Sequence, residues 1–318
     1  MSSENIIKLT KEESDLKKSR GYIFEKYMTD RSNEDRDEVL IGTNDLLPIA
    51  YLEVGIQKAK TVAFIGLPGG GATGFLVSKD LLLTNNHVYP NKEVANQSSV
   101  YFNFDNDIHG NPKPYDEYYC NAEDFFYTNE VLDYSLVKVN KIKKSDGSYS
   151  LSYPGERWGY TPIFPTPGPS QKVSLSINGN LTIIQHPGMR RKEIALRNNT
   201  FYGLNKDYPD FLLYKSDTEP GASGSPIYND AWELIGLHHS AGEKINNVFI
   251  NNEGIMISSI IKDMLSNFPN MKNGNLILAE LGIHFTNEKA KESGSVSVSG
   301  STDSRGGSTV TVTGTWNF

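Results

Sequence analysis

The segment TEPGASGSPIY, residues 218–228, decides how this sequence is interpreted, because it places two serines in a glycine-rich turn before a short β-rich run. Gly221 lies two residues before the first serine, Ser223, and Pro226 follows the second, Ser225. The segment does not fit the G-x-S-x-G nucleophile elbow, since its fifth position is a serine and a strand rather than a helix follows. A serine hydroxyl is a weak nucleophile, so it needs a base, a carboxylate and N–H donors from elsewhere in the chain.

Two upstream segments supply the missing partners of such a serine. GFLVSKDLLLTNNHV, residues 74–88, places His87 after an apolar run and a Thr-Asn-Asn segment, and VLDYSLVKV, residues 131–139, places Asp133 at the start of another apolar run. The order is therefore histidine, aspartate, serine. This is the chain order of chymotrypsin and differs from the orders of subtilisin and of the α/β-hydrolases.

The chain from residue 61 onward predicts an all-β fold. Short β-rich runs separated by turn residues follow one another, without the intervening helices of a doubly wound sheet. One helix is predicted near the end, where GIMISSIIKDMLSNFP, residues 254–269, repeats apolar residues at helical spacing and closes on Pro269. A second is predicted over residues 45–60, with Ile49, Leu52 and Ile56 at helical spacing.

The three blocks around His87, Asp133 and Ser223 resemble those of the chymotrypsin-fold, trypsin-like serine proteases, and most closely the cysteine-free bacterial branch that includes glutamyl endopeptidases. The resemblance covers roughly residues 61–268. It implies two six-stranded antiparallel β-barrels with a C-terminal helix and an N-terminal helical extension. It also implies His87 as general base, Asp133 as its orienting carboxylate, Ser223 as nucleophile, and the N–H groups of Gly221 and Ser223 as the oxyanion hole.

The resemblance leaves the residue preferred on the acyl side of the scissile bond, P1, between two alternatives. Asp217 stands six residues before Ser223, where trypsin-type enzymes carry the aspartate that pairs with a basic side chain. Thr218 and His238 stand where glutamyl endopeptidases contact an acidic one. The adjacent His238 and His239 are expected to face opposite sides of a strand. We favour an acidic P1 residue, with a basic P1 residue, or a pseudoprotease acting as a binding module, as the alternatives.

Three segments are expected along the chain: a charged, helical extension over residues 1–60, a protease domain over 61–286, and a Ser/Gly-rich tail over 287–318. The tail contains two alternating runs that predict either a β-hairpin or a flexible segment. In the extension, cleavage after Glu38 would expose a new amino terminus at Val39. The segment around residues 41–65 resembles that of trypsin-like proteases in bacterial conflict systems, which implies a regulatory or substrate partner protein.

Composition excludes several other classes of function. A net charge of −7 argues against a broad nucleic-acid footprint, and a single cysteine, Cys120, allows neither an intrachain disulfide nor a multi-cysteine metal site. No residue pattern implies a cofactor or a metal, and His109, His186 and His284 lie in no partner motif. No apolar run predicts a signal peptide or a membrane span, so we expect a cytoplasmic protein, with a secreted one as the alternative if a signal peptide has been removed. The expected substrate is a protein or peptide.

Overall fold

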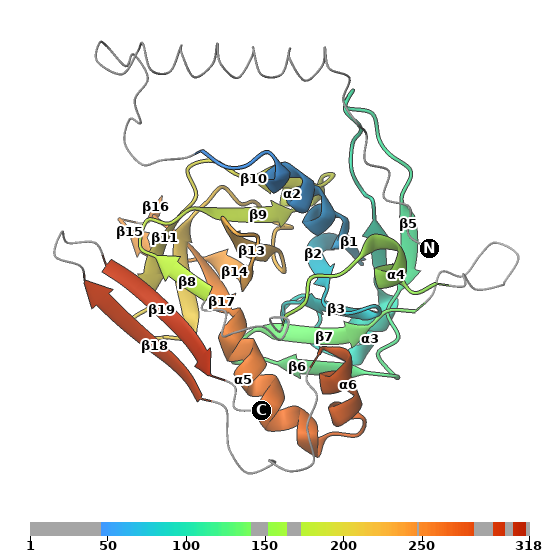
Figure 1. The fold of residues 1–318 in the computed structure, drawn as a ribbon. Coiled ribbons are helices and arrows are strands. Elements are labelled where there is room, and N and C mark those ends of the chain that lie inside the picture. Colours follow the sequence, from blue (N-terminus) through green and yellow to red (C-terminus); the bar gives the residue numbers. More distant parts are fainter. Residues whose placement is uncertain are drawn as a thin grey trace, which may run out of the picture. The chain divides into compact units, whose positions relative to one another are not determined.

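The computed structural model describes residues 46–140, 152–163, 173–246, 248–282, 295–302 and 308–315. The centre of this part of the chain is two antiparallel sheets of seven strands each, followed in the chain by two helices (Figure 1). This is the chymotrypsin-like arrangement that the sequence predicts, with one correction. Each sheet has seven strands where six were expected, because a short additional strand pairs at the edge of each.

The first sheet has the strand order β5-β4-β1-β2-β3-β7-β6. Its strands are β1 (Val62–Leu67), β2 (Gly70–Leu76), β3 (Leu81–Thr84), β4 (Ser99–Phe102), β5 (Asp116–Tyr119), β6 (Phe126–Asn129) and β7 (Tyr134–Lys138). An isolated bridge between Cys120 and Val139 joins the end of β5 to the end of β7. Six strands are thus connected in a ring, and β6 is the seventh, paired only with β7.

The second sheet repeats this pattern with the order β10-β9-β13-β14-β17-β12-β11. Its strands are β9 (Leu181–Gln185), β10 (Glu193–Ala195), β11 (Thr200–Leu204), β12 (Phe211–Lys215), β13 (Pro226–Asn229), β14 (Leu234–Ala241) and β17 (Asn252–Met256). A bridge between Asn180 and Thr200 joins β9 to β11, so β10 is the strand outside the ring. A separate two-stranded ribbon, β15 (Lys244–Ile245) with β16 (Val248–Phe249), lies between β14 and β17 in the chain.

The hydrophobic side chains of the two sheets form three clusters, because successive side chains along a strand point to opposite faces. On β3, Leu82 points into a cluster formed by the first sheet and the segments that connect its strands, whereas Leu81 and Leu83 join a cluster shared by both sheets. Successive side chains of a strand face opposite sides, so a continuous run of leucines is buried on both. The third cluster, which includes Ile183 and Leu212, lies within the second sheet.

The helix α5 (Ile257–Asn267) confirms the helix expected near the end of the chain. Its apolar residues pack into the shared cluster, and a 3-10 turn at Phe268–Asn270 ends it. Asp263 on its polar side accepts hydrogen bonds from the hydroxyls of Tyr127 and Tyr134, so the helix is tied to the first sheet by polar contacts as well. A further helix, α6 (Gly274–Glu280), was not expected from the sequence.

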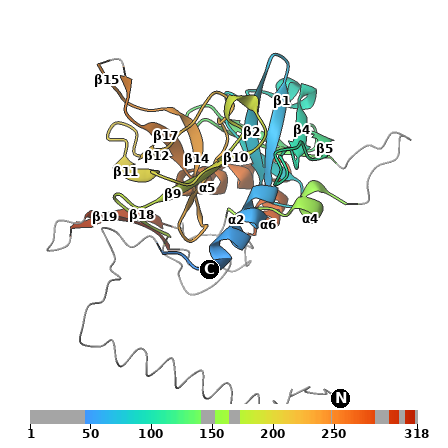
Figure 2. The same cartoon turned by 90° about the horizontal axis from the view of Figure 1, so that it is seen from above.

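The helix α2 (Ala50–Lys60) is also confirmed, but its apolar stripe does not face the core. Ile49 and Ile56 are 79% and 59% exposed. The buried face is instead formed by Tyr51 and Gly55, which pack on Trp232 in the turn between β13 and β14. The indole Nε1 donates to the Tyr51 carbonyl at 2.8 Å, so this glycine face is where the helix attaches (Figure 2 shows the helix from above).

The tail forms the hairpin alternative over its described residues. Strands β18 (Ser295–Thr302) and β19 (Ser308–Thr315) pair antiparallel, and β19 pairs with β8 (Val173–Ser176). Two other expectations, the helix before residue 46 and cleavage after Glu38, fall outside the described residues, and the domain boundaries remain predictions. Over the described parts of the chain, no helix has the length and apolar character required to cross a membrane.

Candidate active site

The pair predicted to be base and carboxylate is assembled at the carboxyl end of β3 and the amino end of β7. Because β3 and β7 are paired neighbours, the loop carrying His87 and the turn carrying Asp133 meet at one edge. His87 Nδ1 lies 2.8 Å from Asp133 Oδ2, and the backbone N–H of His87 donates to Oδ1 at 2.9 Å. An ionised carboxylate only accepts hydrogen bonds, so in the neutral imidazole Nδ1 carries the proton and Nε2 keeps a free lone pair.

A second imidazole binds the same carboxylate oxygen. His239 Nδ1 lies 2.6 Å from Asp133 Oδ2, and the two histidine rings meet edge to face with centroids 6.0 Å apart. His239 comes from β14 of the second sheet, so Asp133 is held from both sheets. The position depends on a β-bulge, since the pairing of β14 with β17 shifts register between His238 and Ser240 and leaves His239 as the extra residue. Bulges redirect side chains in this way next to active sites.

The electrostatics of Asp133 follow from these contacts. Its burial alone would raise the pKa, but the hydrogen bonds from His239 and His87 outweigh burial and lower the pKa of the carboxyl from 3.8 to about 2. The residue is 6% exposed and adopts a left-handed backbone conformation, with φ of +47°. Such a conformation costs free energy in a non-glycine residue and is held here by the surrounding hydrogen bonds.

The loop that carries Ser223 is fixed directly against the strands that lead to His87. Thr73 on β2 donates its backbone N–H to the Ser223 carbonyl at 2.9 Å and its hydroxyl to the Gly221 carbonyl at 2.8 Å. Thr84, three residues before His87, donates its hydroxyl to the Thr73 carbonyl. A Cβ on Gly224 would collide with both threonines, so glycine is required where the loop crosses them.

The same loop presents the groups expected of an oxyanion hole. Gly221 has φ of +103°, and among the described residues neither its N–H nor that of Ser223 has an acceptor. Ser225 is not an accessible nucleophile, because it is buried and its hydroxyl donates to the Ala222 carbonyl at 2.6 Å. The half-buried Ser223 is therefore the serine that the turn leaves available.

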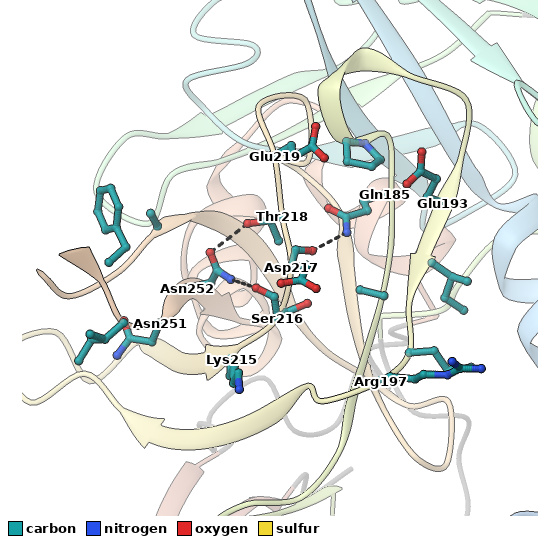
Figure 3. A pocket seen from close by; sticks show the side chains of 17 residues that line it. Gln185, Glu193, Arg197, Lys215, Ser216, Asp217, Thr218, Glu219, Asn251 and Asn252 are labelled. Atoms are coloured by element: carbon teal, nitrogen blue, oxygen red, sulfur yellow. Dashed lines mark hydrogen bonds between the residues drawn. The ribbon is translucent and has the colours of Figure 1, made fainter.

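A cavity of about 1070 Å³ opens in the second sheet beside this loop (Figure 3). Among the residues that line it are Asp217 and Thr218, which the sequence singled out, and Lys215 and Arg197, which it did not. The Thr218 hydroxyl donates to Asn252 Oδ1 at 3.0 Å, while the Asp217 backbone carbonyl accepts from Gln185 Nε2 at 2.8 Å. Neither Asp217, Lys215 nor Arg197 has an ion-pair partner among the described residues.

His238, which the resemblance placed in the P1 pocket, is not among the residues that line the cavity. It is 3% exposed, and burial together with the charges of His239 and His87 lowers its pKa to about 3. Its Nδ1 lies 2.5 Å from the Tyr214 hydroxyl, whose own pKa burial raises well above 10. At neutral pH His238 is therefore an uncharged imidazole. The tyrosine can donate to Nδ1, which leaves the ring proton on Nε2.

The adjacent histidine is the site residue that sequence reasoning missed. Alternation indicates that His238 and His239 face opposite sides, which the structure bears out, but nothing in the pattern says which side holds the carboxylate. The only sequence signal for His239 was that two histidines are adjacent at positions 238 and 239. Of the other histidines, His186 is buried with its pKa lowered to about 3, His109 is exposed, and His284 lies outside the described residues.

Comparisons with known proteins agree with this geometry. The profile of the trypsin-like peptidase domain matches residues 72–237. An uncharacterized protein of Sinorhizobium fredii, y4fB, is 35% identical over 215 residues, which is 64% of this chain and 31% of that protein. Glutamyl endopeptidase of Staphylococcus aureus is 27% identical over 228 residues, 69% of this chain and 60% of the enzyme. The chain thus covers less than two thirds of the length of either relative.

Solved structures resemble the chain more distantly. The serine protease Rv3671c of Mycobacterium tuberculosis, in an inactive form, aligns with a TM-score of 0.45 and 14% identity over 74% of this chain and 98% of its own. A serine endoprotease from Yersinia pestis aligns with a TM-score of 0.44 and 15% identity over 70% of this chain and 67% of its own. Since the domain profile spans 166 of the 318 residues and includes His87, Asp133 and Ser223, the chain belongs to the trypsin-like peptidase domain family.

Proposed function

We propose that this chain is a serine endopeptidase in which Ser223 is the nucleophile, His87 the general base and Asp133 the carboxylate that orients it. The observation that carries the proposal is the hydrogen bond from His87 Nδ1 to the buried, ionised Asp133, next to a serine loop anchored on Thr73. An imidazole held by Nδ1 presents Nε2 as the base, which is what a serine hydroxyl requires.

In the proposed reaction, His87 Nε2 takes the Ser223 proton as Oγ attacks the scissile carbonyl carbon. The carbonyl oxygen becomes an oxyanion that accepts from the N–H groups of Gly221 and Ser223. The imidazolium then gives its proton to the leaving amine as the C–N bond breaks, leaving an acyl-enzyme. Water repeats the sequence in the second half and releases the acid.

His239 supports this chemistry as a positioning residue. It donates to the same oxygen of Asp133 as His87 does, from the opposite sheet, and so restricts the rotation of the carboxylate. It is not among the residues that line the cavity, so its proposed contribution is to the orientation of the base rather than to substrate binding.

For the P1 residue, we propose a preference for Glu or Asp. Support comes from two cations that line the cavity without an ion-pair partner among the described residues, Lys215 and Arg197. The Thr218 hydroxyl lies in the same cavity. His238 contributes no charge at neutral pH, since its pKa is about 3, but an Nε2–H group can still donate a hydrogen bond to a carboxylate.

One observation favours the alternative, cleavage after Arg or Lys. Asp217 lines the same cavity, and its carboxylate likewise has no ion-pair partner among the described residues. A carboxylate close to a bound glutamate would oppose its binding, whereas it would stabilise a guanidinium or ammonium group.

A fluorophosphonate probe tests the proposed chemistry, because it reacts only with an activated serine. Wild-type chain should gain the mass of one probe, and Ser223→Ala and His87→Ala should not. Ser266→Ala is the matched control, since this serine lies on α5 and its hydroxyl donates only to the Lys262 carbonyl. An unlabelled wild-type chain would indicate a pseudoprotease, and label on Ser223→Ala would refute the assignment of the nucleophile.

A peptide-library cleavage profile tests the P1 proposal with two charge-removing variants. Lys215→Met should weaken cleavage after acidic residues by about tenfold, the effect of losing one charge interaction of roughly 1.4 kcal/mol, and Asp217→Asn should strengthen it. A wild-type profile dominated by Arg or Lys, and abolished by Asp217→Asn, would overturn the acidic preference and leave the peptidase assignment intact.

A further inference from the structure

Three metal-ligating side chains converge at the edge between the two sheets. One ring nitrogen of His87, one of His239 and a carboxylate oxygen of Asp133 all lie within 4.8 Å of one another. We propose that these residues form a binding site for Zn²⁺, and that zinc bound there reversibly switches the peptidase off. The inhibitory half of this inference rests on the proposed function, whereas the binding half stands on the geometry alone.

The donor set is of the kind that zinc prefers. Two imidazole nitrogens and one carboxylate oxygen make a three-ligand site that leaves a fourth position for water. The two nitrogens now lie 2.8 and 2.6 Å from Asp133 Oδ2, as hydrogen-bond partners. Ligands around a tetrahedral zinc with bonds of about 2.1 Å are separated by roughly 3.3 Å. The two contacts to Asp133 would therefore lengthen by about 0.5 and 0.7 Å, and the two imidazole nitrogens, which lie within 4.8 Å of each other, would move to the same separation.

A carboxylate stands behind one of the two imidazoles, as it does behind many metal-binding histidines. Glu253 Oε1 lies 3.9 Å from His239 Nε2, on the side of the ring away from Asp133. Its other oxygen accepts from Asn205 Nδ2 at 2.7 Å, so the glutamate is held in place. At 3.9 Å the carboxylate makes no hydrogen bond to the ring, but its negative charge favours a proton on Nε2, the tautomer in which Nδ1 is free to bind a metal.

The site is also open to an ion from solvent. The side chain of His87 is 45% exposed and that of His239 is 27% exposed, while Asp133 supplies a nearly buried charge. The attraction between the ionised carboxylate and the cation offsets the cost of desolvating both.

Zinc binding at this site would remove the base by a change of tautomer. Each neutral imidazole keeps one proton, which moves by exchange with water from Nδ1 to Nε2, and the Nδ1 lone pair binds the metal. The Nε2 of His87 then carries a hydrogen and has no lone pair to accept the Ser223 proton. Removal of the metal restores the original tautomer, so the inhibition is reversible.

Calorimetric titration of Zn²⁺ into the full chain carrying Ser223→Ala tests the binding half without requiring activity. We expect one ion per chain. His239→Asn in this background should weaken binding by at least about tenfold, because an amide nitrogen cannot ligate while it still donates to Asp133. His109→Gln is the matched control, since it removes an exposed histidine elsewhere and should change nothing. No binding, or binding unaffected by His239→Asn, would overturn the site.

Peptide hydrolysis by the wild-type chain tests the inhibitory half. Zinc should abolish cleavage, a chelator should restore it, and His239→Asn should raise the half-inhibitory zinc concentration at least about tenfold relative to its own zinc-free rate. Binding at the site with undiminished cleavage would refute the switch. A chain that binds zinc but cleaves nothing even in its absence would instead refute the proposed function.

Discussion

Replacing His239 tests whether the second imidazole on Asp133 matters for catalysis. His239→Leu keeps a side chain of comparable bulk but removes the donor that lies 2.6 Å from Asp133 Oδ2. A hydrogen bond to a charged group contributes about 1.5–3 kcal/mol. If that free energy holds the carboxylate in the orientation His87 needs, its loss appears in the transition state, where each 1.4 kcal/mol is a factor of ten. We therefore expect kcat to fall roughly 10- to 100-fold.

Two comparisons separate positioning from general disruption of the fold. His239 does not line the cavity, so KM should change by less than about threefold while kcat falls. His239→Asn places an amide donor near the position of Nδ1 and should recover most of kcat. The assay is steady-state hydrolysis of the best library peptide, with thermal unfolding measured on the same samples. A leucine variant with wild-type kcat, or an asparagine variant no better than leucine, would refute the reasoning.

Three further outcomes are expected. Gly224→Ala forces a side chain into Thr73 at φ of +86°, which costs at least 1–2 kcal/mol, and should slow fluorophosphonate labelling about tenfold or more. The carboxyl pKa of Asp133 is depressed from 3.8 to about 2 on folding, so it stabilises the chain by about 2 kcal/mol above pH 4 and loses this as pH falls from 4 toward 2. Between pH 6 and pH 3, the free energy of unfolding measured in urea should therefore fall by about 1 kcal/mol less in Asp133→Asn than in wild type. Equal decreases in the two proteins would show that the Asp133 carboxyl does not couple protonation to stability. Trp232→Phe removes the hydrogen bond to the Tyr51 carbonyl and should lower the free energy of unfolding by about 1–3 kcal/mol. It should also speed proteolysis at α2, and an unchanged rate of cleavage there would refute this attachment.

The sequence alone predicts the all-β fold class and the terminal helix, which the structure shows, and it singles out three candidate site residues whose roles stay predictions. His87, Asp133 and Ser223 each stand beside a short apolar run, and such runs are local patterns that a strand period reveals. The helix α5 was equally readable, because its buried residues recur at the helical period and Pro269 follows them. The additional edge strands β6 and β10 escaped notice, since they are short and none of their residues is fully buried.

The tertiary structure decided the contacts that depend on how distant segments meet. The spacing of Ile49 and Ile56 predicts a helix, but which face is buried depends on Trp232, far away in the chain, which fits against Gly55. The pairing of β19 with β8 joins segments more than 130 residues apart. No local sequence pattern predicts which strands meet across a loop of that length.

The choice between the two adjacent histidines shows the same division. Alternation separates His238 from His239, but a one-residue bulge against β17 sets where each points, and a bulge is a property of two paired strands. As a result, His239 reaches Asp133 and His238 lies buried against Tyr214. The residue types and their order could thus be read from the sequence. The second histidine joins the site only in the tertiary structure, because the edges of two sheets meet around one carboxylate.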